Sequence, residues 1–260
     1  MIGVFDSGLG GLSVLTALTC ALPDADYIYL ADSANAPYGD KSEAFIQQRV
    51  LALGAHLVGA GCTMLVVACN TGTVAAIQSL RAAYPGIAVV GVEPGIKPAA
   101  ESSLSRKIAV LATEATARSE RLAQLVKQHA TGVHVDIVAC PGWATLVEQC
   151  HINDSGLARD AERWLDPLLA SGVDRIVLGC THYSFLSHVL QPIAGPRAEL
   201  VDVSAAIARQ AMRLHKGHGN SSGSLQLLTT GQSHRLRSAL PLLGLDVLAT
   251  RVRSITQVAV

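Results

Sequence analysis

Aromatic side chains are scarce in this chain of 260 residues, at 4% of the total. Ala, Val, Leu and Ile must therefore fill most of the core, and they belong to the hydrophobic half of the composition. Charged residues are also few, at 15%, and they balance, because 20 Lys and Arg stand against 20 Asp and Glu. The chain has no basic run and no alternation of aromatics with Arg, so we expect no nucleic-acid partner.

Long apolar runs are missing as well. No window approaches the ~18 to 20 apolar residues of a membrane span, and the opening "MIGVFDSGLG" has no basic leader. We therefore expect no membrane partner and a cytoplasmic location. In a cytosolic chain of this size we expect free thiols and no disulfide framework, and the lack of a CxxC pair argues against a thioredoxin-like or zinc-ribbon site. The six cysteines are Cys20, Cys62, Cys69, Cys140, Cys150 and Cys180.

Short runs rich in Val and Ile alternate with longer segments of helical spacing. This order predicts an α/β fold whose mostly parallel sheets are flanked by helices. Ligands of such folds bind beyond the carboxyl ends of the strands. The strand-like runs are 1–5, 26–32, 64–70, 87–93, 107–113, 135–141 and 175–181, and the helical segments include 42–59, 73–83, 116–129 and 155–171.

The chain divides into two similar halves in this interpretation. We expect a first domain formed by 1–92 and 206–260, and a second formed by 93–205. The stretch 216–224 is the most flexible by composition. Cys69 and Cys180 end two similar strands 111 residues apart, which suggests a weak internal repeat. We therefore expect two pseudo-symmetric domains that face each other across a cleft holding the active site.

The opening "VFDSGLGGLS" places three glycines after the first strand. A dinucleotide-binding module, which needs GxGxxG, is the main alternative. Ser13 stands at the third glycine position, and Asp6 would put a carboxylate where a pyrophosphate should lie. We favour a tight turn whose backbone N–H groups hold a small anion, such as a carboxylate, at the start of a helix.

Cys69 and Cys180 each combine a strand end with the expected start of a helix. A buried structural thiol is the ordinary explanation for such a cysteine. Free N–H groups at a helix start stabilise a thiolate, however, and polar side chains follow both residues. Four roles stay open: zinc ligands together with His182, a disulfide, a nucleophile with a resolving thiol, or two acid/base groups flanking one carbon.

Other polar residues lie near these strand ends. His182 is two residues from Cys180 and could hold a proton near that thiol, and Asp6 could do the same for the other. Glu148 lies on an expected helix, where a solvated carboxylate is the equal alternative. The turn "NAPYGDKS" leads into a helix with Ser42 or Asp40 as its N-cap, and Tyr38 with Gly39 could reach a ligand through the phenol and a backbone N–H.

Five segments resemble the glutamate racemases, the cofactor-independent amino-acid racemases of bacterial cell-wall synthesis. "GVFDSGLGGLSVL", "LADSANAPYGDKS", "ACNTGTVAAI", "GVEPGIKPA" and "LGCTHYSFL" occur in the order and spacing of that family. The resemblance spans nearly the whole chain. It implies interconversion of L- and D-glutamate, which supplies D-glutamate for peptidoglycan, with no cofactor and no metal. A homodimer is the assembly left open.

The resemblance also implies roles for individual residues. Cys69 and Cys180 become the two bases, acting on D- and L-glutamate respectively. Asp6, His182 and Glu148 assist the thiols. The implied substrate contacts are Asp6, Ser7, Tyr38, Gly39, Asn70, Thr71, Thr113, Thr116, Thr181 and His182. The second half departs most from the family pattern, at Ala115 and in the run of Gly142, Trp143 and Ala144.

The residues reduce the list of candidate substrates only in part. Racemases or decarboxylases of aspartate, hydantoin or malonate are the close enzymatic alternatives. Asn70 and Thr71 paired with Thr181 and His182 favour glutamate, while a nucleotide-binding or regulatory module is the alternative from another class.

Overall fold

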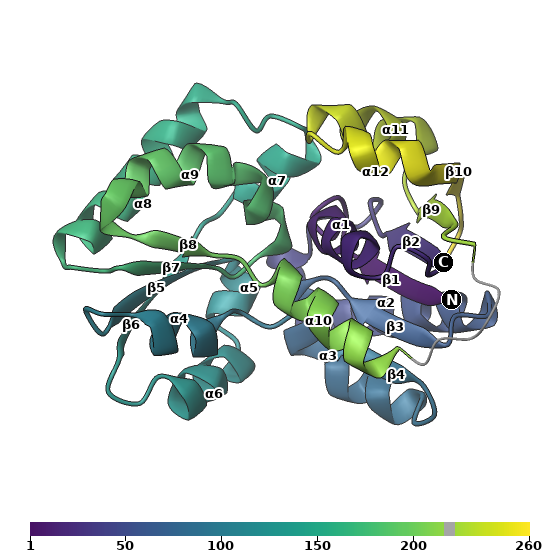
Figure 1. Ribbon diagram of the computed structural model, residues 1–260, viewed down its shortest axis with the longest axis horizontal. Helices are drawn as coiled ribbons and strands as arrows, with labels where there is room; N and C mark the ends of the chain where they lie inside the picture. The colour runs from purple at the N-terminus through teal and green to yellow at the C-terminus, as the bar shows by residue number, and fades with distance from the viewer. Residues whose placement is uncertain (216–221) are drawn as a thin grey trace.

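Two parallel sheets organise the part of the chain that the computed structural model describes, residues 1–215 and 222–260. The first has six strands in the order β10-β9-β2-β1-β3-β4, and the second has four in the order β6-β5-β7-β8. Every paired register is parallel, which confirms the predicted fold class. Figure 1 shows the sheets side by side, with the second at the left.

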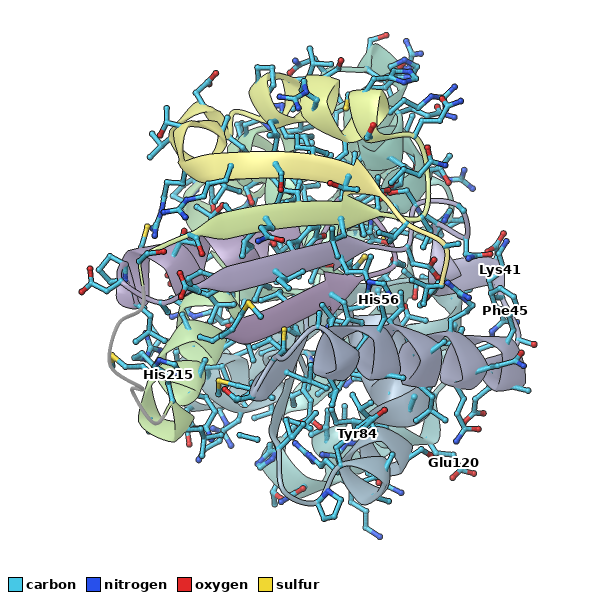
Figure 2. All side chains as sticks on the ribbon, turned by 90° about the vertical axis from the view of Figure 1, so that its right-hand side faces the viewer. Lys41, Phe45, His56, Tyr84, Glu120 and His215 are labelled. Atoms are coloured by element: carbon cyan, nitrogen blue, oxygen red, sulfur yellow. The ribbon has the colours of Figure 1, made fainter. Side chains whose placement is uncertain are left out.

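The strands of the first sheet are β1 (Ile2–Asp6), β2 (Tyr27–Ala31), β3 (Met64–Val67), β4 (Ala88–Gly91), β9 (Leu225–Thr229) and β10 (Val252–Gln257). Those of the second sheet are β5 (Lys107–Ala112), β6 (His134–Ala139), β7 (Arg175–Leu178) and β8 (Glu199–Val201). Figure 2 looks onto the first sheet and shows its strands lying side by side.

Helices cover both faces of each sheet, because successive side chains of a strand point to opposite faces. Ile2 and Val4 pack in one core cluster with α1 (Leu12–Ala21), whereas Phe5 packs in another with α2 (Glu43–Gly59). The remaining helices are α3 (Asn70–Ala83), α4 (Ile96–Ser102), α5 (Glu114–Ala117), α6 (Glu120–His129), α7 (Trp143–Glu148), α8 (Ser155–Ala170), α9 (Ser187–Ala194), α10 (Ser204–Leu214), α11 (Ser233–Leu242) and α12 (Asp246–Arg251), with short 3₁₀ helices η1 (Tyr38–Asp40), η2 (Thr181–Leu186) and η3 (Gly195–Arg197).

The first core cluster continues from one sheet to the other. It contains Val4 and Tyr29 of the first sheet together with Ile176 and Leu178 of the second. A third cluster fills the opposite face of the second sheet, beneath α4 and α6. The two sheets therefore share apolar packing on the side where α1 meets η2.

Two predicted helices have different boundaries in the structure. The segment 116–129 forms α5 and α6, because the Ser119 hydroxyl accepts a hydrogen bond from the Leu122 N–H and starts a new helix. Helix α3 begins at Asn70, earlier than predicted, with Cys69 at its N-cap. The predicted N-cap Ser42 is confirmed, since its hydroxyl accepts from the Phe45 N–H.

The C-terminal strands β9 and β10 were not predicted. They join the first sheet beside β2, where Tyr29 pairs with Leu227. The stretch predicted to be flexible, 216–224, lies outside the described residues at 216–221. The described end of this stretch, at Ser222 and Ser224, hydrogen-bonds to Asp26 before β9. The division into domains at 92/93 and 205/206 stays a prediction.

Within the ranges 1–215 and 222–260, no helix is long and apolar enough to cross a membrane.

Candidate active site

Cys69 lies at the point where β3 passes into α3. Its side chain caps that helix, because the Gly72 N–H donates to Sγ at 3.3 Å. The thiol lies 3.8 Å from the Ser7 hydroxyl oxygen, to which it donates. Only 6% of the residue is exposed. A strand end and a helix start thus hold one thiol in a closed, polar setting.

Cys180 has the equivalent position in the second sheet, between β7 and η2. The helix that follows is a six-residue 3₁₀ helix, and the thiol does not cap it. Its Sγ lies 3.6 Å from Nδ1 of His182 instead. Only 5% of Cys180 is exposed. The two thiols therefore share a position in the fold but differ in their hydrogen-bond partners.

The charges around Cys69 link the two thiols. Burial raises the pKa of the Cys69 thiol well above its ordinary value, and the charges of Asp6 and Cys180 raise it further. The Gly72 N–H opposes this rise only in part. Cys69 is therefore protonated in this state, and it lies within electrostatic reach of the second thiol.

Asp6 connects the loops that carry the thiols. Its Oδ2 accepts from the Gly8 N–H at 2.9 Å, and its Oδ1 accepts from the Thr181 hydroxyl at 3.4 Å. Burial raises the pKa of Asp6, while the charge of His182 works against that rise. The end of β1 is thus bonded directly to the residue that follows Cys180.

His182 and Glu148 form a buried acid–base pair on the Cys180 side. His182 Nε2 lies 2.6 Å from Glu148 Oε1, and His182 is 2% exposed. Burial lowers the pKa of His182, but its hydrogen bonds to Cys180 and Glu148 outweigh burial and raise the pKa well above its ordinary value. Glu148 is therefore not the freely solvated carboxylate that was the alternative from sequence.

The glycine turn holds carboxylates, and both come from the chain itself. The Gly8 N–H donates to Asp6, and the Leu9 N–H donates to Glu148 Oε1 at 2.6 Å. The sequence predicted that such N–H groups would hold a small anion, and it did not identify the anion as Glu148. In this state the two groups have partners already, so they are not free to bind a phosphate.

Three threonine hydroxyls form a triangle where the two sheets meet. Thr71 Oγ1 lies 3.0 Å from Thr113 Oγ1 and 3.2 Å from Thr116 Oγ1, and the last two are 3.2 Å apart. Thr71 lies in the first turn of α3, whereas Thr113 caps α5. The structure therefore brings together three of the substrate residues that the resemblance implied.

Asn70 has unused hydrogen-bonding capacity in the same region. Its residue is 2% exposed, and both Oδ1 and Nδ2 are buried without a hydrogen-bond partner. A buried amide in this condition is costly unless something else satisfies it. Since Asn70 lies next to Cys69 and Thr71, its free amide indicates a ligand subsite there.

Tyr38 uses its phenol elsewhere. The hydroxyl donates to Asp32 Oδ2 at 2.5 Å, and Arg49 forms two hydrogen bonds with the same carboxylate. Burial, and then the charge of Asp32, raise the pKa of Tyr38. The phenol is thus occupied, which leaves backbone groups as the means by which Tyr38 and Gly39 could reach a ligand. Gly39 lies against Thr113, since a Cβ on it would be 2.9 Å from Thr113 Cβ.

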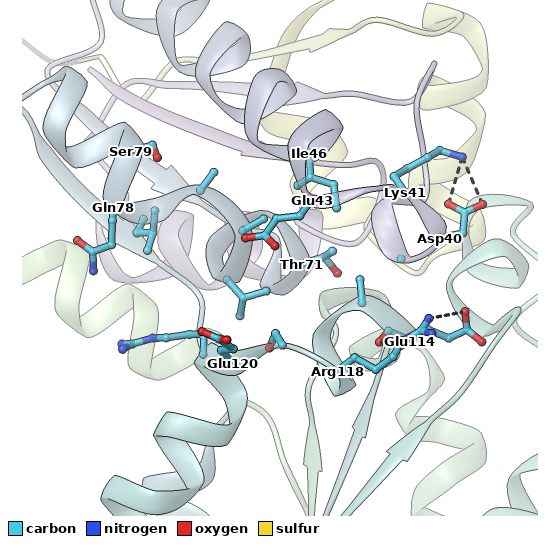
Figure 3. Close-up of a pocket in the computed structure, with 18 of the residues that line it drawn as sticks. Asp40, Lys41, Glu43, Ile46, Thr71, Gln78, Ser79, Glu114, Arg118 and Glu120 are labelled. Atoms are coloured by element: carbon cyan, nitrogen blue, oxygen red, sulfur yellow. Dashed lines mark hydrogen bonds and ion pairs between the residues drawn. The ribbon is translucent and has the colours of Figure 1, made fainter.

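A cleft of about 680 Å³ opens beside the threonine triangle. Figure 3 shows Glu43 and Thr71 on one side of it, with Arg118 and Glu120 on the other. A smaller cavity of about 160 Å³ lies against Gly39, Thr113 and Tyr183. Gly39 lines both openings, whereas the thiols themselves are closed off from solvent.

The remaining chemical alternatives for the thiols can be compared with this geometry. All six cysteines are free, so Cys69 and Cys180 are not joined as a disulfide. Among the described residues, no group of three or more His, Cys, Asp or Glu side chains is arranged to hold a metal ion. The arrangement is suited to proton transfer, with one thiol protonated and the other beside an imidazole.

Sequence reasoning missed two features of the site. The Leu9 N–H binds Glu148, but a backbone donor leaves no signal in side-chain identity. Asp32 and Arg49 fix Tyr38, although they are 17 residues apart. An Asp at a strand end followed by an Arg within a helix was the available signal, and it is common in α/β chains.

Comparisons with known proteins agree with this geometry. Residues 10–211 match the family profile described as Asp/Glu/Hydantoin racemase. A protein of Ectopseudomonas mendocina named glutamate racemase is 39% identical over 246 residues, which cover 93% of this chain and 94% of that protein.

Solved structures of glutamate racemases also superpose on this chain. Escherichia coli glutamate racemase, crystallised with L-glutamate and the activator UDP-MurNAc-ala, superposes with a TM-score of 0.84 at 30% identity, covering 99% of this chain and 97% of the other. Glutamate racemase from Aquifex pyrophilus gives 0.80 at 32% identity, covering 98% and 97%. The likeness to these two structures extends over both sheets.

Proposed function

This chain belongs to the Asp/Glu/Hydantoin racemase family, and we propose that it interconverts L- and D-glutamate through the thiols of Cys69 and Cys180. The observation that carries the proposal is the placement of two buried thiols, each at the carboxyl end of a strand of a different sheet, within electrostatic reach of each other. Glutamate is proposed as the substrate because the relatives of similar length are named for it.

The proposed reaction moves one proton at a time. A thiolate removes the α-hydrogen of glutamate as a proton, and the electron pair stays on the substrate as a carbanion. The opposite thiol then gives its proton to the other face of the same carbon, which inverts the centre and leaves the thiolate on that side. Only protons move, so the oxidation state of the substrate does not change, and the two thiols are proposed to suffice without a cofactor.

The two thiols have different starting states in this mechanism. The raised pKa of Cys69 keeps that thiol protonated, ready to donate. The raised pKa of His182, whose Nδ1 lies 3.6 Å from Cys180 Sγ, keeps a proton on the imidazole, and this positive charge stabilises a thiolate at Cys180. Glu148 stabilises the imidazolium. The unliganded site is therefore prepared to remove a proton with Cys180 and to deliver one from Cys69.

Substrate binding is assigned to the unsatisfied and hydroxyl-bearing groups. The free amide of Asn70 and the hydroxyls of Thr71 and Thr181 can donate to the substrate carboxylate, which stabilises the carbanion as its charge spreads onto those oxygens. Ser7, Gly39, Thr113 and Thr116 complete the proposed contacts.

We also propose a role in cell-wall synthesis, because the D-glutamate formed by this activity would be incorporated into peptidoglycan. A cytoplasmic location is proposed as well, since both thiols must stay reduced to transfer protons. Assembly as a homodimer stays a prediction, to be tested by light scattering of the purified chain.

Circular dichroism during incubation with L-glutamate tests the function. The ellipticity of L-glutamate should decay to zero with the purified chain alone, while that of L-aspartate should persist. In D₂O the product should carry deuterium at the α-carbon, since the thiols exchange with solvent. A stable L-glutamate signal, or inversion with the original hydrogen retained, would reject the mechanism, and faster loss of the aspartate signal would reassign the substrate.

A further inference from the structure

The turn of Gly8 and Leu9 meets a carboxylate from the other sheet. Glu148 is the last residue of α7, the helix that follows β6 of the second sheet. Gly8 and Leu9 lie between β1 of the first sheet and α1. Glu148 Oε1 lies 2.6 Å from the Leu9 N–H nitrogen and 2.6 Å from His182 Nε2. One carboxylate oxygen therefore has two donors, one from each half of the chain.

Gly8 is needed here for its lack of a side chain. A Cβ on Gly8 would lie 2.5 Å from Glu148 Cδ and 2.6 Å from Oε2, distances that real Cβ atoms do not show. Gly10 is similar, because a Cβ there would lie 2.6 Å from Thr181 Oγ1 and 2.7 Å from His182 Cε1. Residues of the second half thus fill the space beside both glycines.

Backbone conformation does not account for these glycines. Neither Gly8 nor Gly10 is among the described glycines with positive φ, so an alanine could adopt either backbone. The space, and not the turn itself, is what requires glycine. The turn also ends at the start of α1, where free N–H groups favour a negative charge.

We propose that the turn of Gly8 and Leu9 is a receptacle for the Glu148 carboxylate, and that through this carboxylate it positions His182 beside Cys180. The inference rests on the proposed function, since it assigns a positioning role within the same site. Glu148 orients the imidazole, and the Leu9 N–H orients Glu148.

Gly8→Ala tests the receptacle. The added methyl must push the carboxylate away by about 1 Å, and a displacement of that size in a supporting group can cost about a hundredfold in rate. We expect kcat for L-glutamate to fall about a hundredfold. KM should change less than about twofold, because neither Gly8 nor Glu148 is assigned a substrate contact. Gly59→Ala is the matched control, since a Cβ on Gly59 meets nothing within 4 Å, and it should leave kcat unchanged.

A double-mutant cycle shows whether the effect passes through Glu148. In a Glu148→Ala background no carboxylate remains to be displaced, so adding Gly8→Ala should change kcat less than about twofold. A loss in that background as large as in the wild type would overturn the inference, as would wild-type kcat in Gly8→Ala. Thermal melts of each variant establish that it is folded.

The double variant, Gly8→Ala with Glu148→Ala, keeps the test usable if Gly8→Ala alone does not fold. It lacks the clash and can be compared directly with Glu148→Ala. Equal kcat values in the double variant and in Glu148→Ala support the receptacle, and a lower kcat in the double variant overturns it. A wild-type chain without racemase activity would reject the proposed function itself, whereas an active wild type with additive losses rejects only this inference.

Discussion

The hydroxyl of Thr71 lies 3.0 Å from that of Thr113, although Thr71 lies in the first turn of a helix packed on the first sheet and Thr113 caps a helix of the second. Thr71 has a second partner in Thr116. The two halves are therefore joined by neutral hydroxyls at this point, beside the unsatisfied amide of Asn70. Neutral hydroxyl contacts are weak enough to be exchanged for contacts to a substrate carboxylate.

Replacing Thr71 should separate binding from folding. Thr71→Val keeps the shape but removes the hydroxyl, so KM for glutamate should rise about fivefold, for about 1 kcal/mol of lost hydrogen bonding. Thr71→Ser retains the hydroxyl and should stay within about threefold of the wild type. Initial-rate kinetics of both variants check this, with the exposed Thr250→Val as the control. An unchanged KM in Thr71→Val would remove Thr71 from the substrate contacts.

Each thiol should be indispensable for racemisation. A serine hydroxyl is a far weaker acid than a thiol, so Cys69→Ser and Cys180→Ser should each lose at least roughly a thousandfold in kcat, within the range of general acid–base effects. The exposed Cys20→Ser should retain full activity. Circular dichroism of L- and D-glutamate measures the rates. Normal turnover in either active-site variant contradicts a two-thiol mechanism.

The buried amide of Asn70 should be a cost to the free protein. Asn70→Ala removes two unsatisfied polar atoms, so its melting temperature should equal or exceed that of the wild type. Glutamate should raise the melting temperature of the wild type and not that of the variant, because ligand stabilisation requires binding. A wild-type-like shift in Asn70→Ala would show that the amide is not a ligand group.

The pair of His182 and Glu148 should make stability depend on pH. Hydrogen bonds to Cys180 and Glu148 raise the folded-state pKa of His182 against the effect of burial, as described above. The stabilisation from this raised pKa is fully present below the unfolded value of about 6.5 and is lost as pH rises through the folded pKa. The melting-temperature deficit of Glu148→Gln should therefore be largest near about pH 6 and shrink as the pH rises through the folded pKa of His182.

The control for this series is Glu162→Gln, a change on the exposed face of α8. Its melting temperature should differ from the wild type by a constant amount over the same range. A deficit of Glu148→Gln that grows with pH would show that His182 is neutral in the folded state.

The strand ends and their thiols were predictable because they depend on local sequence. Runs such as 64–70 and 175–181 combine β-branched residues with a terminal Cys, and parallel pairing brings their ends to one edge of each sheet. The resemblance implied an assisting role for Glu148, which no local pattern determines, and it agreed with the roles that the strand-end positions suggested for Asp6 and His182.

Other features depend on long-range contacts and were not predictable. The Tyr38 phenol donates to Asp32, and the same carboxylate accepts hydrogen bonds from Arg49 of α2 and from Thr230, which follows β9. Thr230 lies far from the other two partners in the sequence. The Ser119 hydroxyl caps α6 and so divides the predicted helix 116–129 in two. The spacing of apolar residues, on which that prediction depended, contains no signal for such a cap.

The position of β9 has a consequence for synthesis on the ribosome. Strand β2 can pair with β1 at once, but its other edge has no partner until β9 emerges, nearly 200 residues later in the chain. During that interval the apolar edge of Tyr27–Ala31 is unpaired, and unpaired edges bind other chains. The second sheet, formed by contiguous sequence, can meanwhile complete itself. Nascent-chain aggregation, and any need for a chaperone, should therefore arise at the first sheet and end with translation of its last two strands.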